Sequence, residues 1–280
     1  MGYFERALFA AVVIGAGAGF VGALVVLRRR TFFAQALTHA TYPGAVGAAA
    51  LGVSVPLGAA VASVVLVAAM AAIARVRRQG AQVAAGIVLT GGFAAGALLQ
   101  AAIPGLPVRA ESLLVGSILT VSDGDILLAA SVALVAVALV AAFGKEIAFS
   151  TFDQAGFRAA GFREWPIEVL VLGLIAASVV SSLPAVGAIL AIALLAAPAT
   201  AARLLVPSFR GILIAAPVIG AASGVLGVLA SRTFAIAAGP AIALAATAFF
   251  LLALGISKLR GLPLNPVASP VATAEDARIA

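Results

Sequence analysis

The sequence predicts an all-α protein, a polytopic transmembrane helical bundle of about eight or nine spans. Of its 280 residues, 64% are hydrophobic and only 10% are charged, whereas a soluble domain carries about 25% charged residues. Apolar stretches recur along nearly the whole chain. They are too long and too uninterrupted for barrel strands, which alternate and run about 10 residues. A lone segment in lipid satisfies its backbone hydrogen bonds only as a helix.

Nine apolar segments are long enough to cross a bilayer. They cover residues 7–27, 33–52, 56–74, 82–103, 125–143, 168–182, 185–206, 211–231 and 234–256. The first is too long for the core of a signal peptide, so we expect it to remain as a span. The apolar piece 112–121 is too short to cross alone, and we expect a half-membrane helix there. Residues 1–260 thus form the predicted transmembrane domain, and 261–280 form a predicted disordered cytoplasmic tail.

Positive charge sets the predicted orientation. We place the N-terminus outside and let the nine spans alternate in direction. The inside segments then hold thirteen Lys or Arg residues, and the outside segments hold three. Because Lys and Arg concentrate in cytoplasmic loops, we expect the N-terminus outside and the C-terminus in the cytoplasm. The same clusters account for the net charge of +7. The expected partner of this charge is therefore membrane lipid, and no nucleic acid is expected.

One ionisable ring lies within the apolar sequence. His39 is the sole histidine and falls inside the second predicted span. An ionisable group in a membrane is costly and usually marks a site where something is bound or moved. On a helix, Gln35, Thr38, His39 and Tyr42 share one face. That face predicts a path for a divalent transition metal, with His39 as the metal ligand. The alternative is a buried histidine hydrogen-bonded to a neighbouring helix.

Catalytic motifs are absent from the sequence. Without cysteine, the chain has no disulfide, thiolate metal site or Cys nucleophile. It also lacks GxxxxGK[ST], HExxH and a Ser/His/Asp arrangement. We therefore expect no enzyme activity of its own and no permanently bound cofactor. Glu111, Asp123 and Asp125 flank the short apolar piece, where we expect helix capping and loop ends; the alternative is a cation-attracting mouth.

A short surface helix is predicted in the longest internal inside loop, residues 144–165. Asp153 is placed to N-cap this helix, and Gly161 is placed to end it.

Three segments together resemble the membrane permeases of ABC importers for zinc, manganese and iron. The first, RRR followed by ALTHA and PG within 28–44, is similar to the family's R…GDALSHA…PG. The second, D…RAAG at 153–161, is similar to D-P-E-x-A-R-A-x-G in the loop that docks on the ATPase. The third, VGAIL…LL…PATA at 186–201, resembles VG-x-LLV-x-ALL-x-x-PAATA. The three occur in order and at the expected points of the topology.

The resemblance implies a permease subunit of an ATP-driven importer that moves a divalent transition metal into the cytoplasm, in a multi-pass arrangement in a bacterial inner or plasma membrane. Its implied partners are cytoplasmic ATPase subunits that hydrolyse ATP, an extracytoplasmic metal-binding protein and a second permease copy in a homodimer. It places His39 in the metal path. It also makes the segment from Asp153 to Gly161 the ATPase-coupling loop, with matches at Asp153, Arg158, Ala159 and Gly161.

Two positions depart from the family pattern. Members commonly place an Asp four residues before the His, where this chain has Gln35, and they often show D-L-P-x-G where residues 234–239 hold no acid. Fewer carboxylates favour zinc first and manganese second, because manganese and iron prefer harder oxygen ligands. The rival functions are an ion-coupled secondary transporter, disfavoured by the scarcity of intramembrane acids, and a non-transporting membrane scaffold or receptor subunit.

Overall fold

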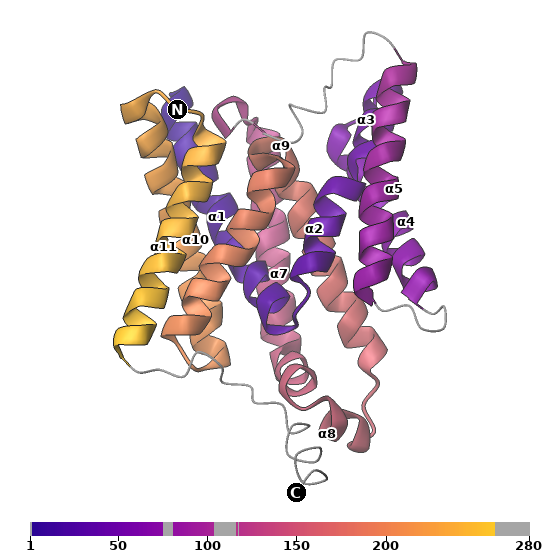
Figure 1. Ribbon diagram of the computed structural model, residues 1–280, viewed down its shortest axis with the longest axis vertical. Helices are drawn as coiled ribbons and strands as arrows, with labels where there is room; N and C mark the ends of the chain where they lie inside the picture. The colour runs from indigo at the N-terminus through magenta and orange to yellow at the C-terminus, as the bar shows by residue number, and fades with distance from the viewer. Residues whose placement is uncertain (1, 75–80, 104–115, 117, 261–280) are drawn as a thin grey trace, which may run out of the picture.

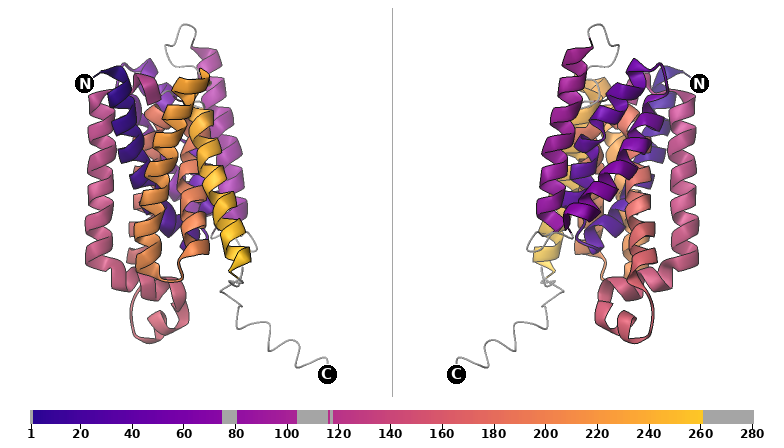
Figure 2. Two further views of the ribbon diagram at one scale, coloured as in Figure 1. Left: turned by 90° about the vertical axis from the view of Figure 1, so that its left-hand side faces the viewer. Right: turned by 90° about the vertical axis from the view of Figure 1, so that its right-hand side faces the viewer.

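The computed structural model describes residues 2–74, 81–103, 116 and 118–260. Within these residues the chain forms helices and no strands. Figures 1 and 2 show the helices standing side by side along the longest axis, so the predicted all-α bundle is confirmed. The elements are α1 (Tyr3–Leu27), α2 (Thr31–Ala40), α3 (Tyr42–Ala50), α4 (Val55–Ala74), α5 (Ala81–Ala102), η1 (Ile118–Thr120), α7 (Asp123–Phe152), α8 (Gln154–Ala159), α9 (Glu164–Leu205), α10 (Phe209–Phe234) and α11 (Ala238–Leu259).

Eight helical segments among the described residues are long and apolar enough to cross a membrane. The short helices α2 and α3 add a ninth, broken pass (Figure 1). The predicted span 33–52 is therefore formed by two short helices, with an interruption at Thr41. Pro43 follows directly, and proline lacks the N–H that an uninterrupted helix needs and clashes with the preceding turn. The interruption places His39 in the last turn of α2.

The sixth and seventh predicted spans are joined without a loop, as the two arms of α9. The arms are Glu164–Leu183 and Ala185–Leu205. At the start of the second arm Gly187 has φ 76° and ψ 164°, a conformation that glycine adopts readily because it lacks a Cβ. Figure 1 shows the two arms descending from a common bend. The fifth span also differs from its prediction: non-helical dihedrals occur at Phe143, but α7 continues to Phe152.

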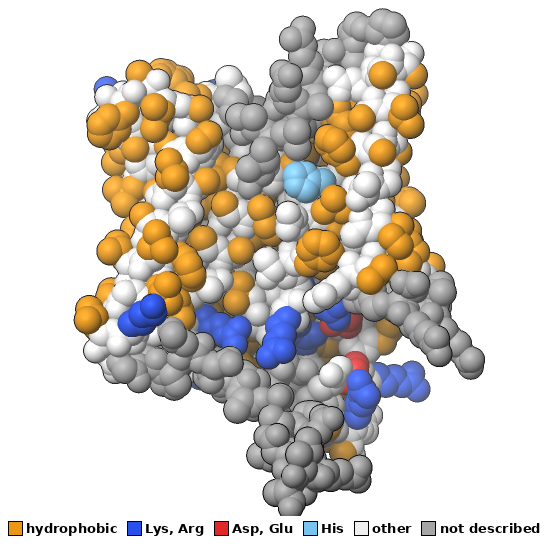
Figure 3. All heavy atoms as spheres, viewed as in Figure 1, with side chains coloured by type: hydrophobic (Ala, Val, Ile, Leu, Met, Phe, Trp, Pro, Cys, Tyr) orange, Lys and Arg blue, Asp and Glu red, His pale blue; other side chains and the backbone are white. Residues whose placement is uncertain are grey.

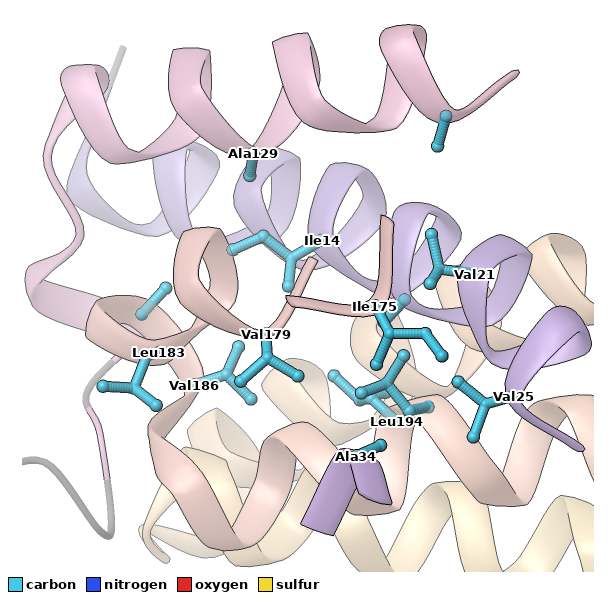
Figure 4. Close-up of a cluster of buried hydrophobic side chains, with 14 of the residues drawn as sticks. Ile14, Val21, Val25, Ala34, Ala129, Ile175, Val179, Leu183, Val186 and Leu194 are labelled. Atoms are coloured by element: carbon cyan, nitrogen blue, oxygen red, sulfur yellow. The ribbon is translucent and has the colours of Figure 1, made fainter. Parts of the chain in front are cut away.

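The core forms around α1. Figure 4 shows Ile14, Val21 and Val25 of α1 facing residues of α2, α7 and α9, including Ala34, Ala129, Ile175, Val179, Leu183 and Leu194. In contrast, the outer helices α4, α7 and α11 are mostly exposed along their apolar spans. Exposed apolar surface of this kind suits contact with lipid, because hydrocarbon tails are as apolar as leucine.

Small residues bring α1 and α10 together. A Cβ added at Gly15 would overlap the carbonyl of Gly220, and a Cβ added at Gly220 would overlap the carbonyl of Gly15. Membrane helices approach closely where such residues meet, because dispersion contacts rather than hydrophobic burial hold them together. The contact fixes the position of α1, and hence of the arginines that follow it.

The described Lys and Arg residues divide between the two ends of the bundle. Arg6 and Arg232 lie at the end where α1 begins, and the rest lie at the opposite end, called the basic end below (Figure 3). The basic end carries Arg28, Arg29, Arg30, Lys145, Arg158, Arg163, Arg203, Arg210, Lys258 and Arg260. This segregation is what the predicted orientation requires, with the basic end on the cytoplasmic side.

Three sequence expectations fall wholly or mostly outside the described residues. These are the role of Glu111, the cytoplasmic tail at 261–280 and most of the half-membrane helix at 112–121, of which Ile118–Thr120 forms a 3₁₀ turn. The capping role is confirmed at Asp125, which exchanges hydrogen bonds with Ser122 in a capping box at the start of α7. Asp123 instead pairs with Arg6 at 2.9 Å.

Candidate functional site

The open face of α2 carries the predicted site. α2 packs against α5 and α9, and it buries Ala34, Ala36, Leu37 and Ala40. Phe32 and Gln35 are exposed and His39 is half-buried, which is the spacing of one helix face. Gln35 and His39 therefore lie on the same open side of the helix.

His39 lies between two groups of helices. In Figure 3 the histidine side chain is visible on the surface between the column formed by α5 and the central helices. Its ring meets Phe93 of α5 edge-on, with centroids 6.4 Å apart and planes at 88°. Among the described residues it makes no hydrogen bond and no ion pair. The alternative was a buried histidine hydrogen-bonded to a neighbouring helix, and the described residues contain no hydrogen bond to the His39 ring.

Thr38 and Tyr42 turn away from that open face. Thr38 is buried, and its hydroxyl donates to the backbone carbonyl of Gln35 at 2.8 Å, a common arrangement for threonine in a helix. Tyr42 is also buried. Its ring stacks on Phe93, with centroids 5.6 Å apart, and its hydroxyl donates to Gln100 of α5. The four residues of the predicted face are thus divided into two pairs.

The ligand chemistry of the open face is sparse. No group of three or more His, Cys, Asp or Glu side chains gathers anywhere in the described part of the chain. His39 offers one imidazole and Gln35 one neutral amide oxygen. Such a pair suits transient contact with a borderline metal ion, since tight structural sites need about four ligands.

The predicted surface helix is confirmed as α8 at the basic end. The Asp153 carboxylate accepts a hydrogen bond from the N–H of Gly156 at 2.8 Å and caps the helix. At the other end Gly161 has φ 84°. The N–H of Phe162 donates to the carbonyl of Phe157, and the N–H of Gly161 donates to that of Arg158. These two bonds form a Schellman motif, and Phe157 stacks on Phe162 as its hydrophobic contact.

Charged contacts hold α8 to the first turn of α9. Arg158 donates to both oxygens of Glu164, at 2.7 and 3.0 Å. Gln154 donates to the same carboxylate at 3.0 Å. In addition, Phe157 is buried and meets Phe149 of α7 edge-on. α8 is thus fastened to both helices that flank it.

One helical turn further along α9, Glu168 joins three elements. Its carboxylate accepts from Arg28, at 3.0 Å, and from Arg30. Arg28 follows α1 and also donates to Thr151 and Ser150 at the end of α7, while Arg30 is the N-cap residue of α2. We call Glu168, Arg28 and Arg30 the basic-end latch.

The latch contains a buried charge. The Arg28 side chain is 9% exposed. Burial lowers the pKa of Arg28 from its ordinary value, and the Glu168 carboxylate acts in the opposite direction. The sequence reasoning did not single out Glu168. The sequence feature that could have indicated Glu168 is its i, i+4 spacing from Glu164 at the start of a span, in a chain that has few acidic residues.

A family model described as the ABC 3 transport family matches residues 1–257. The chain belongs to this family. It is 30% identical to the manganese transport system membrane protein MntC of Halalkalibacterium halodurans, over 92% of this chain and 89% of that protein. It is 33% identical to the zinc transport system membrane protein TroC of Treponema pallidum, over 92% and 90%.

A solved structure resembles this ABC 3 family chain in three dimensions. A chain of PsaBC from Streptococcus pneumoniae in complex with Fab has a TM-score of 0.82 and 28% identity, covering 90% of this chain and 91% of that one. The family expected from three sequence segments is therefore confirmed. With the eight membrane-long helices, it makes the chain a multi-pass protein of the plasma membrane.

Proposed function

We infer that the chain is the permease subunit of an ATP-driven importer for a divalent transition metal. The observation that carries this proposal is His39, a half-buried imidazole on the open face of an interrupted membrane helix, without a hydrogen bond among the described residues. An ionisable ring is costly inside a membrane, so its presence there indicates that an ion binds to it during passage. Relatives whose names specify manganese or zinc transport support the same class of substrate.

Within that class, zinc is the first candidate and manganese the second. His39 supplies nitrogen, which zinc accepts readily, and Gln35 supplies a neutral oxygen in place of a carboxylate. The relatives include both a manganese and a zinc system, so the local ligands are the basis for this order.

The proposed partners are two cytoplasmic ATPase subunits, an extracytoplasmic metal-binding protein and a second copy of this permease.

In this proposal α8 docks on an ATPase subunit at the basic end. The described contacts offer a continuous route from α8 to the metal path: Arg158 holds Glu164, Glu168 lies one turn away on the same helix, and Arg30 connects Glu168 to the start of α2. Rigid elements linked by ion pairs are one physical means by which movement passes between distant sites.

The rival ion-coupled carrier is disfavoured by where the carboxylates lie. Every described Asp or Glu lies within the first or last two turns of its helix or in a connection, whereas proton- or sodium-coupled carriers use acids inside the membrane. A scaffold or receptor subunit would need neither α8 docking nor metal-dependent turnover. Co-purification with an ATPase subunit therefore separates the importer from the scaffold.

The deciding experiment measures ATP hydrolysis by the reconstituted transporter with its partner proteins. Zinc, manganese and iron are supplied in turn, and uptake into vesicles is recorded in parallel. We expect stimulation by zinc, a weaker response to manganese, and ATP-dependent metal accumulation. A transporter that hydrolyses ATP at the same rate with and without every metal, and accumulates none, would contradict the proposal.

A carboxylate at position 35 should increase the apparent affinity of the metal path for manganese. Gln35→Asp places an acid on the exposed face, four residues before His39. An opposite charge at about 4 Å near a protein surface contributes on the order of 1–4 kcal/mol, so we expect the half-saturating manganese concentration to fall by about tenfold. Gln35→Asn is the matched control, because it shortens the side chain without adding charge. Equal responses of the two variants would remove position 35 from the path.

The coupling role of α8 is tested at Gly161. Gly161→Leu forces a side chain into a left-handed conformation and costs about 1–2 kcal/mol at the end of α8. We expect the ratio of metal taken up to ATP hydrolysed in vesicles to fall, while the ATPase subunits still hydrolyse ATP. Gly173→Leu is the control, since Gly173 lies within α9 with open space around it. An unchanged ratio in Gly161→Leu would count against docking through α8.

A further inference from the structure

A hollow lies at the basic end of the described structure, away from His39. It has a volume of about 550 Å³, within the range of about 300–1,000 Å³ typical of small-molecule sites. Its walls come from the α1–α2 connection, the end of α7, the first residue of α8, both ends of α9 and the start of α10. Residues that line it include Arg28, Arg29, Arg30, Glu168 and Arg203.

Charge in this cavity is unbalanced. Four arginines face one glutamate, which leaves an excess of three positive charges. Glu168 is already engaged by Arg28 and Arg30. The side chains of Arg29 and Arg203 make no hydrogen bond or ion pair with any residue that the structure describes. A dense group of guanidinium ions repels itself unless an anion lies among them, and guanidinium forks bind phosphate oxygens in pairs.

The cavity is also amphipathic. Ser150 and Thr151 add hydroxyl groups beside the arginines, whereas Phe152, Leu204, Leu205 and Ile212 form an apolar wall. All of these residues lie where membrane-spanning helices end. A free phosphate ion would contact only the polar side and leave the apolar wall unused. A phospholipid presents a phosphate next to glycerol and acyl chains, so it can contact both the arginines and the apolar wall.

We propose that this cavity binds the phosphate headgroup of an anionic phospholipid, with Arg29 and Arg203 as the principal contacts. Basic pockets between helices on the cytoplasmic side of a membrane protein are suited to anionic lipids, and each Lys or Arg contributes about 1 kcal/mol to such binding. The lipid phosphate offsets part of the excess charge beside the basic-end latch. It is therefore placed to stabilise the latch, and its binding depends neither on the metal nor on ATP.

The test uses the purified full-length chain and native mass spectrometry. Cardiolipin is added as the anionic probe and phosphatidylethanolamine as the zwitterionic probe. We expect cardiolipin to be retained and phosphatidylethanolamine to be lost. Arg29→Gln combined with Arg203→Gln should weaken cardiolipin binding about thirtyfold, from two lost contacts. Both substitutions leave the ion pairs of Glu168 with Arg28 and Arg30 intact.

The control combines Arg210→Gln with Arg260→Gln, which removes the same charge at exposed positions of the basic end outside the cavity. We expect binding within about threefold of the original chain. Equal loss in both double variants would overturn the proposal in favour of diffuse attraction by surface charge. Displacement of cardiolipin by millimolar inorganic phosphate would overturn it in favour of free phosphate. Loss of the lipid on adding the ATPase subunits would assign the cavity to a protein interface instead.

Discussion

His39→Ala is expected to abolish metal uptake while the bundle still folds. The ring has a single described aromatic contact, edge-on to Phe93, and such a pair contributes about 1 kcal/mol beyond its buried area. Its loss is therefore small against the stability of the whole bundle. In contrast, the substitution removes the sole imidazole of the chain, and no cluster of other metal-ligating side chains replaces it among the described residues. We expect metal accumulation in vesicles and metal-stimulated ATP hydrolysis to fall to background.

Thr38→Ala is the matched control for this experiment. Thr38 is adjacent to His39 on α2, but its hydroxyl is buried and bonds the carbonyl of Gln35 within its own helix. Uptake should stay near that of the original chain. Thermal unfolding of both variants separates loss of transport from loss of fold. Normal uptake by a folded His39→Ala variant would remove the imidazole from the mechanism.

Glu168→Gln is expected to destabilise the basic end and to break the coupling of ATP hydrolysis to transport. The substitution leaves Arg28 buried without its carboxylate, and an uncompensated buried charge costs about 3–5 kcal/mol. Glu168 itself is 29% exposed, so water screens part of this interaction and the lower end of that range applies. The start of α2 also loses the ion pair at Arg30. We expect a lower unfolding temperature and fewer metal ions moved per ATP hydrolysed.

Glu5→Gln serves as the control for Glu168→Gln. Glu5 lies in the first turn of α1, and its carboxylate accepts an exposed hydrogen bond from Gly2. A surface change of this kind usually alters stability by no more than about 0.5 kcal/mol. Equal melting temperatures and equal coupling in Glu168→Gln and Glu5→Gln would contradict the latch.

Sequence patterns predicted the elements that depend on local chemistry. The apolar segments predicted the eight helical segments that are long enough to cross a bilayer, because length and hydrophobicity alone determine what can cross. α8 was predicted with its ends, since Asp153 as a cap and Gly161 as a terminator act within a few residues of the helix. The segregation of Lys and Arg was also visible in the sequence. Even the family was identified from short segments around residues 28–44, 153–161 and 186–201.

Helix-face periodicity was less reliable at the site. Gln35, Thr38, His39 and Tyr42 share a face on an ideal helix, but the chain is interrupted at Thr41, and Tyr42 bonds Gln100 of α5. A spacing rule assumes an unbroken helix and takes no account of competing partners. The proline beside the interruption was present in the sequence as Pro43, whereas the contact of Tyr42 with Gln100 joins residues 58 positions apart and is visible only in the folded chain.

The sequence by itself determined that this protein is a helical membrane bundle, which family it belongs to, and that its one imidazole lies within a span. Only the tertiary structure decided that Thr38 and Tyr42 turn inward, that Glu168 receives Arg28 and Arg30, and that four arginines surround one cavity. The physical reason is distance along the chain. Spans and caps are set by neighbours a few residues apart, whereas Arg28 and Glu168 are 140 positions apart and meet only after α1, α7 and α9 have packed together.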